Sequence, residues 1–208
     1  MKAHISTTGF YASFIALIAI IGFGIVQLLQ LLSITVYPMD EILIYGFSLA
    51  IAPPFLIAIL ALHYLSSDER KFWSHAALLF AVMYVVYVVL MYTVQLATVI
   101  PFSLQHKEDS VLAVKPHSLF WTIDALGYIC MGLSTLFAAF AFNKNTGENL
   151  LRKFLIANGL VVPLISFVYF SPNFSNRLLL LGTPWLITAS GSLLLLTRFF
   201  KKNSSSVK

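Results

Sequence analysis

The sequence predicts an all-α, polytopic membrane protein: a six-transmembrane-helix bundle with both termini in the cytoplasm. The first indication is composition, because 59% of the 208 residues are hydrophobic and only 10% are charged, against roughly 25% charged in an average soluble domain. A soluble fold of this size still exposes about a third of its chain surface, so much apolar surface would meet water. The other two indications are six recurring apolar stretches and the placement of the basic residues.

Each apolar stretch reaches the about 20 residues that an α-helix needs to cross the hydrocarbon core. Backbone polar groups in lipid need internal partners, which favours helices over open strands. The first stretch lacks a small-residue cleavage site and is therefore predicted to remain as a helix. We predict one transmembrane domain over residues 1–208, with helices at approximately 10–35, 42–65, 76–100, 118–142, 152–171 and 178–199.

Basic residues alternate between the predicted connections as the positive-inside rule requires. The termini and every second connection hold 10 of the 13 lysines and arginines, and the other connections hold 3. A wrong helix count would scramble this alternation, so the split predicts cytoplasmic termini. It also explains the net charge of +5 without a nucleic-acid partner. The first group is Lys2, Arg70, Lys71, Lys144, Arg152, Lys153, Arg198, Lys201, Lys202 and Lys208; the second is Lys107, Lys115 and Arg177.

Prolines fall near the middle of two predicted helices. Pro53 and Pro54 lie in the second helix and Pro163 lies in the fifth, and proline removes a backbone hydrogen bond and kinks a helix. These positions correspond if the chain is divided into two halves of three helices, as in transporters built from inverted repeats. No other residue-level similarity joins the halves, and chance explains the coincidence better.

Asp124 is the polar residue that most clearly lies within a predicted span. It lies about 9 Å along the helix from Ser118, at 1.5 Å per residue, in the outer leaflet. A charged carboxylate costs about 2.5–3.5 kcal/mol at the centre of a membrane helix, so Asp124 is expected to face the bundle or a wet cavity. It is either a proton, cation or ligand site, or a structural group solvated from outside or bonded between helices.

Other polar side chains are predicted at a similar depth. They share helix faces by their spacing of three or four residues, and they predict a polar chamber that opens outward. The alternative is that each one bonds between packed helices. The predicted ligand-binding residues are Asp124, Gln95, Tyr92, Gln27, Gln30 and Tyr128.

Tryptophans and several tyrosines lie near the predicted helix ends. Amphipathic rings prefer the membrane interface, so Trp73, Trp121 and Trp185 are predicted to be interfacial anchors that need no ligand.

Three functional hypotheses follow. The first is a non-enzymatic bundle that binds or transports an apolar or weakly polar small molecule or lipid at the outer polar site. The second is an intramembrane enzyme acting on a lipid or isoprenoid-like substrate, with Asp124 as acid or base. The third is a structural or sensory membrane subunit.

The sequence contains no recognisable metal-binding or cofactor-binding motif, so no metal and no cofactor is predicted. The expected partners are membrane lipids and an apolar small molecule, and the oligomeric state is left open. Short connections favour a bacterial inner membrane as the location.

Overall fold

The computed structural model describes residues 2–105, 111–143, 147–175 and 178–205, and every regular element within them is helical. Six spans in this part of the chain are long and apolar enough to cross a membrane, which confirms the all-α, six-helix prediction. The helices are α1 (Lys2–Leu31), α2 (Met39–Leu65), η1 (Asp68–Arg70), α3 (Lys71–Val94), the π-helix η2 (Gln95–Val99), α4 (Ile100–Leu104), α5 (Leu119–Phe140), α6 (Asn149–Leu160), α7 (Val162–Phe170), η3 (Leu178–Gly182) and α8 (Thr183–Ser205).

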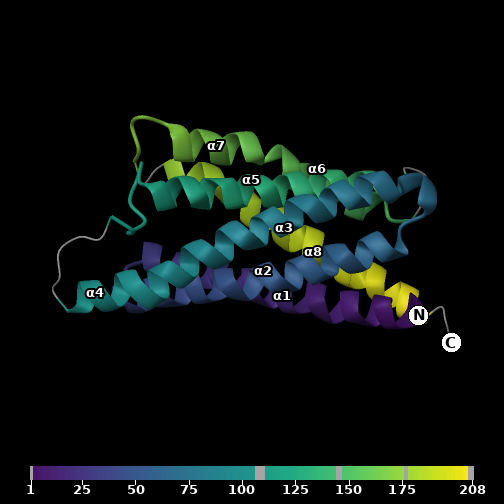
Figure 1. The fold of residues 1–208 in the computed structure, drawn as a ribbon, viewed down its shortest axis with the longest axis horizontal. Coiled ribbons are helices and arrows are strands. Elements are labelled where there is room, and N and C mark those ends of the chain that lie inside the picture. Colours follow the sequence, from purple (N-terminus) through teal and green to yellow (C-terminus); the bar gives the residue numbers. More distant parts are fainter. Residues whose placement is uncertain (1, 106–110, 144–146, 176–177, 206–208) are drawn as a thin grey trace.

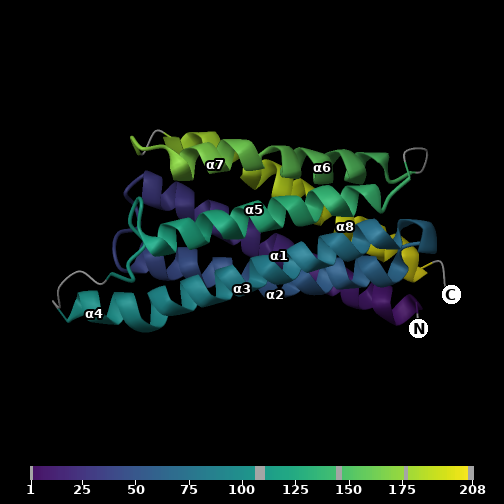
Figure 2. The ribbon, with the colours of Figure 1, turned by 45° about the horizontal axis from the view of Figure 1, so that its top comes forward.

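Contacts between the helices follow the chain and close into a ring. α1 packs on α2, α2 on α3 and α3 on α5; α5 packs on α6 and α7, α6 on α8, and α8 on α1. The helices run along one long axis with both termini at the same end (Figures 1 and 2). We call this the terminal end, and the opposite end, where α4 lies, the distal end. Each span therefore has a face toward a common interior.

Many small residues are fully buried between the helices, and many large apolar residues are exposed on the outside of the bundle. On α1, Ala16 is fully buried, whereas Ile18 and Ile25 are about half exposed. Ala58 on α2 and Ala77 on α3 are also fully buried. Lipid tails cover large apolar side chains as well as a protein core does, and small residues let helix backbones approach. Buried small residues together with exposed large apolar residues are the pattern expected of a membrane bundle.

Several helix ends differ from the predicted boundaries. α1 begins at Lys2 because its polar first turns contain no proline, and it ends at Leu31, shortly before Ser33 adopts a positive φ of 55°. The third span continues past residue 100 to Leu104, and the last continues to Ser205. Hydropathy indicates which residues lie in lipid, whereas a helix ends only where its pattern of backbone hydrogen bonds is broken. The predicted limits therefore missed the polar ends of these helices.

The two proline positions have different effects. The fifth span divides near Pro163, because α6 ends at Leu160 and α7 begins at Val162. α2 continues as one helix through Pro53 and Pro54. The two halves of the chain therefore differ at these prolines, because only the fifth span is divided into two helices.

At the terminal end, Arg70 caps a neighbouring helix. Its Nη1 donates hydrogen bonds to the carbonyl oxygens of Phe140, at 3.0 Å, and Phe142, at 2.9 Å. These carbonyls lie at the end of α5, where a helix leaves its last acceptors without internal donors. A cation is favoured at such a terminus by the helix dipole. The short connection between α2 and α3 is thereby fixed against α5.

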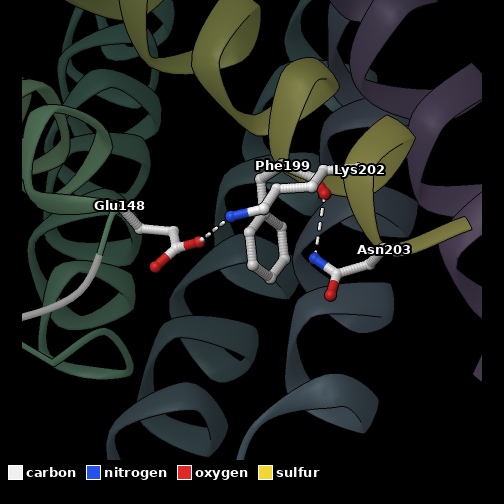
Figure 3. A network of polar contacts seen from close by, with 4 residues as sticks. All are labelled: Glu148, Phe199, Lys202 and Asn203. Atoms are coloured by element: carbon white, nitrogen blue, oxygen red, sulfur yellow. Dashed lines mark hydrogen bonds and ion pairs between the residues drawn. The ribbon is translucent and has the colours of Figure 1, made fainter. Parts of the chain in front are cut away.

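A second polar contact joins the end of α8 to the beginning of α6. Lys202 Nζ lies 3.4 Å from Glu148 Oε1, and Asn203 Nδ2 donates to the Phe199 carbonyl at 2.9 Å (Figure 3). The Lys202 side chain is 73% exposed, so this ion pair contributes little to stability. Of the basic residues used in the topology prediction, Lys107, Lys144, Arg177 and Lys208 lie outside the described residues.

Candidate functional site

A small cavity lies inside the ring of helices, in the distal half. Its volume is about 10 Å³, which is room for about one water-sized group. We call it the central cavity. Five of the six spans contribute to its wall, because α1, α2, α3, α5 and α8 all turn a face toward it. The lining residues are Phe23, Ser48, Ile51, Tyr84, Val88, Tyr92, Asp124, Tyr128 and Trp185.

Asp124 is held by two tyrosine hydroxyl groups from neighbouring helices. Tyr92 Oη donates to Asp124 Oδ1 at 2.9 Å, and Tyr169 Oη donates to Asp124 Oδ2 at 2.6 Å. Asp124 and Tyr92 are buried, and Tyr169 is half-buried. Both carboxylate oxygens thus have partners, as buried polar groups require. The three residues tie α3, α5 and α7 together near the distal ends of these helices.

Aromatic rings pack around this hydrogen-bonded group. Tyr169 lies against Trp121, with ring centroids 4.5 Å apart, and Trp121 Nε1 donates to the Tyr169 carbonyl at 2.9 Å. Tyr128 meets Trp185 edge to face at 5.0 Å, and Phe23 meets the same indole edge to face at 5.8 Å. Such contacts favour one relative orientation of the rings. The wall of the site is therefore ordered by packing as well as by hydrogen bonds.

A larger cavity lies beside the central one. It has a volume of about 280 Å³ and is bounded by the distal part of α1, by α5, by α7 and by the segment from η3 into α8. We call it the distal cavity. It shares Phe23, Tyr128 and Trp185 with the central cavity. Its lining residues are Phe23, Gly24, Gln27, Leu28, Gln30, Leu31, Tyr128, Ile165, Val168, Tyr169, Leu179, Leu180, Gly182, Thr183, Trp185 and Leu186.

The predicted site residues divide between these cavities and other positions. Asp124 and Tyr92 lie together at the central cavity, and Tyr128 lines both cavities. Gln27 and Gln30 line the distal cavity, so they lie on its wall rather than against the carboxylate. Their predicted role in ligand binding stays a prediction.

Gln30 and Gln95 have partners of their own. Gln30 Nε2 donates to Asp40 Oδ2 at 2.7 Å, which links the end of α1 to the start of α2. Gln95 is buried; its Nε2 donates to the Leu112 carbonyl at 2.8 Å, and its Oε1 accepts from the Val114 N–H at 3.2 Å. Gln95 therefore contacts the connection before α5 and is not bonded to Asp124.

Replacing Gln95 by leucine is expected to loosen the connection around Val114. The substitution removes the acceptor of the Val114 N–H and the donor to Leu112, and one such hydrogen bond is worth about 1 kcal/mol. Amide hydrogen exchange of a peptide covering 111–118 should therefore become about five- to tenfold faster. Gln27→Leu, the same chemical change on the cavity wall, is the control and should leave this peptide unchanged. Equal exchange in the parent and Gln95→Leu would contradict the anchoring role.

Two residues of the site were not predicted as part of it. Tyr169 holds the second oxygen of Asp124, and its position near the distal end of the fifth span, at the depth of Asp124, was the available signal. Trp185 was expected at the interface, but it is 6% exposed and borders both cavities. Trp121 is also buried, at 9%. These two indoles therefore face the helix bundle, which hydropathy could not predict because it gives the depth of a residue and not the direction of its side chain.

The fold and its cavities define a class, a multi-pass α-helical membrane protein with a polar and aromatic site between its helices. Among the described residues, no group of three or more histidine, cysteine, aspartate or glutamate side chains is placed to hold a metal ion. Comparisons with protein-family models, with curated proteins and with solved structures found no match to this chain. Its function is therefore inferred from the geometry of the site.

Proposed function

We propose that this protein is a non-enzymatic membrane bundle that binds an apolar or weakly polar small molecule in the distal cavity. Transport of that molecule is the natural extension of binding. The observation that carries the proposal is the distal cavity of about 280 Å³ beside the Tyr92–Asp124–Tyr169 group. Small-molecule sites commonly measure about 300–1,000 Å³ and combine apolar walls with a few polar groups. The distal cavity is near the lower end of that range.

The wall of the distal cavity suits an apolar body with a polar end. Leucine, isoleucine and valine side chains from α1, α7, η3 and α8 form much of it, and Tyr128 and Tyr169 supply the hydroxyl groups. Because the Tyr169 hydroxyl donates its hydrogen bond to Asp124, the Tyr169 oxygen is left with lone pairs for a second partner. Asp124 thus acts on a ligand in the distal cavity by orienting a tyrosine rather than by direct contact.

The enzymatic alternative has less support. Acid–base chemistry needs groups within mutual reach, and the described residues that line the two cavities include no second carboxylate and no histidine. A solid core with Asp124 facing a loop would favour the structural or sensory alternative. Here Asp124 lines the central cavity and accepts hydrogen bonds from two other helices. Binding therefore has the stronger support.

We further propose that the terminal end is cytoplasmic, in a bacterial inner membrane. The described basic residues favour this orientation under the positive-inside rule. At the terminal end they are Lys2, Arg70, Lys71, Arg152, Lys153, Arg198, Lys201 and Lys202, and at the distal end Lys115. The distal cavity would then lie in the outer half of the membrane.

Binding can be tested with an octan-1-ol that carries a photoreactive diazirine, using the protein in lipid nanodiscs. We expect saturable labelling of peptides from the distal part of α1 and from η3, with unlabelled octan-1-ol as competitor. Leu180→Trp, which adds bulk to the cavity wall, should reduce labelling at least fivefold, since filling a well-defined apolar site removes the space for the ligand.

Leu181→Trp is the matched control, because Leu181 is similarly exposed and does not line the cavity. It should label like the parent. Asp124→Asn keeps the shape of the site and should weaken labelling about fivefold through loss of an oriented tyrosine. Labelling spread evenly over lipid-facing helices, or unchanged by Leu180→Trp, would refute the proposed function.

A further inference from the structure

The indole N–H of Trp185 is a buried donor that none of the described residues accepts from. Trp185 is 6% exposed, and its Nε1 has no hydrogen-bond partner in the part of the chain that the structure describes. Most buried polar atoms in proteins have partners, and tryptophan Nε1 can only donate. Trp121 satisfies this requirement in the same molecule, because its Nε1 donates to the Tyr169 carbonyl at 2.9 Å. The indole N–H of Trp185 is therefore a donor that a bound molecule can use.

The indole of Trp185 is part of the wall of both cavities. Trp185 lines the central cavity together with Asp124, and it lines the distal cavity together with Tyr169. The central cavity, at about 10 Å³, has room for about one oxygen atom, and the distal cavity, at about 280 Å³, has room for a larger apolar body. Edge-to-face contacts with Phe23 and Tyr128 hold the indole in place between them.

An oxygen in the distal cavity beside this indole would meet groups of both kinds. Trp185 supplies a donor, while the oxygens of Tyr128 and Tyr169 supply acceptors. An alcohol hydroxyl can accept from the indole and donate to an oxygen at the same time, whereas an ether oxygen can only accept. A hydrocarbon can do neither.

The charge of the ligand follows from the wall of the distal cavity. The described residues that line it include no lysine, arginine, histidine, aspartate or glutamate. A charged group buried there would lack a counter-charge, which is costly in an apolar environment. The cavity wall therefore favours a neutral molecule.

We propose that the ligand is a neutral alcohol with an apolar chain. Its hydroxyl group accepts a hydrogen bond from Trp185 Nε1 at the wall of the distal cavity, and its chain fills the rest of that cavity. This inference rests on the proposed function and specifies the class of molecule that the site takes.

The test compares three competitors of nine heavy atoms each against the diazirine probe described above: octan-1-ol, 1-methoxyheptane and nonane, with concentrations expressed per mole of lipid. In the parent, octan-1-ol should compete about tenfold better than nonane, the ratio expected for satisfying a buried donor, with the ether between them. Trp185→Phe should remove the advantage of octan-1-ol and leave competition by nonane within about twofold of the parent value.

A second measurement uses the unmutated protein. The ¹H–¹⁵N indole signal of Trp185, assigned by its absence in Trp185→Phe, should move downfield on addition of octan-1-ol and stay in place with nonane. Equal competition by octan-1-ol and nonane, or an indole signal indifferent to the alcohol, would overturn the ligand class while leaving binding in the distal cavity intact. Absence of saturable labelling would overturn the proposed function and this inference with it.

Discussion

Replacing Asp124 by leucine is expected to lower the free energy of unfolding by about 2–4 kcal/mol. The carboxylate accepts hydrogen bonds from Tyr92, at 2.9 Å, and from Tyr169, at 2.6 Å. Leucine has a similar size but no acceptor, so both hydroxyl groups would lose their partner within the bundle. The change can be measured by titrating the protein in mixed micelles with sodium dodecyl sulfate and following its circular dichroism.

Thr122→Leu is the control for this substitution. Thr122 lies on the same helix and is exposed, so the change should alter stability by less than about 0.5 kcal/mol. Tyr92→Phe and Tyr169→Phe should each cost about 1 kcal/mol in the parent and much less in the Asp124→Leu background. If the tyrosine variants cost the same in both backgrounds, the two hydroxyl groups are not coupled to Asp124.

Gly159→Ala is expected to destabilise the bundle by about 1–3 kcal/mol, the usual cost of overpacking. A Cβ atom at Gly159 would lie 2.6 Å from the Cβ of Leu136 and 3.1 Å from the carbonyl oxygen of Gly132. The Leu136 Cβ and the Gly132 carbonyl oxygen are both attached directly to the backbone of α5. They therefore cannot move aside as the end of a flexible side chain can. α6 would have to shift away from α5. The same titration measures the loss.

Gly46→Ala is the matched substitution, because a Cβ atom at Gly46 would meet nothing within 4 Å. Gly46 lies inside α2, where alanine is the better helix former by about 0.5–1 kcal/mol. Stability should therefore stay equal or rise slightly. Similar destabilisation by both variants would show that close packing at Gly159 is not the cause.

The fold was largely predictable, because a membrane span is a property of one continuous segment. Six stretches of sufficient length and hydropathy became six spans, and the helices that end in polar turns, such as α1 and α8, were misjudged only at their limits. The break near Pro163 followed from proline chemistry. The continuity of α2 through Pro53 and Pro54 could not be read from the same rule, because tertiary packing decides whether a helix tolerates proline.

The sequence by itself determined that Asp124 lies inside a span at the level of Tyr92, since depth along a helix depends only on counting residues. Only the tertiary structure decided that Tyr169 completes the hydrogen bonds of Asp124 and that Gln95 turns to the connection around Val114. It also decided that the indole of Trp185, which has no hydrogen-bond partner among the described residues, borders two cavities. These outcomes depend on the rotation of each helix about its own axis and on which helices become neighbours. Packing among all six spans sets the rotation of each helix and its neighbours, so neither can be predicted from a single segment.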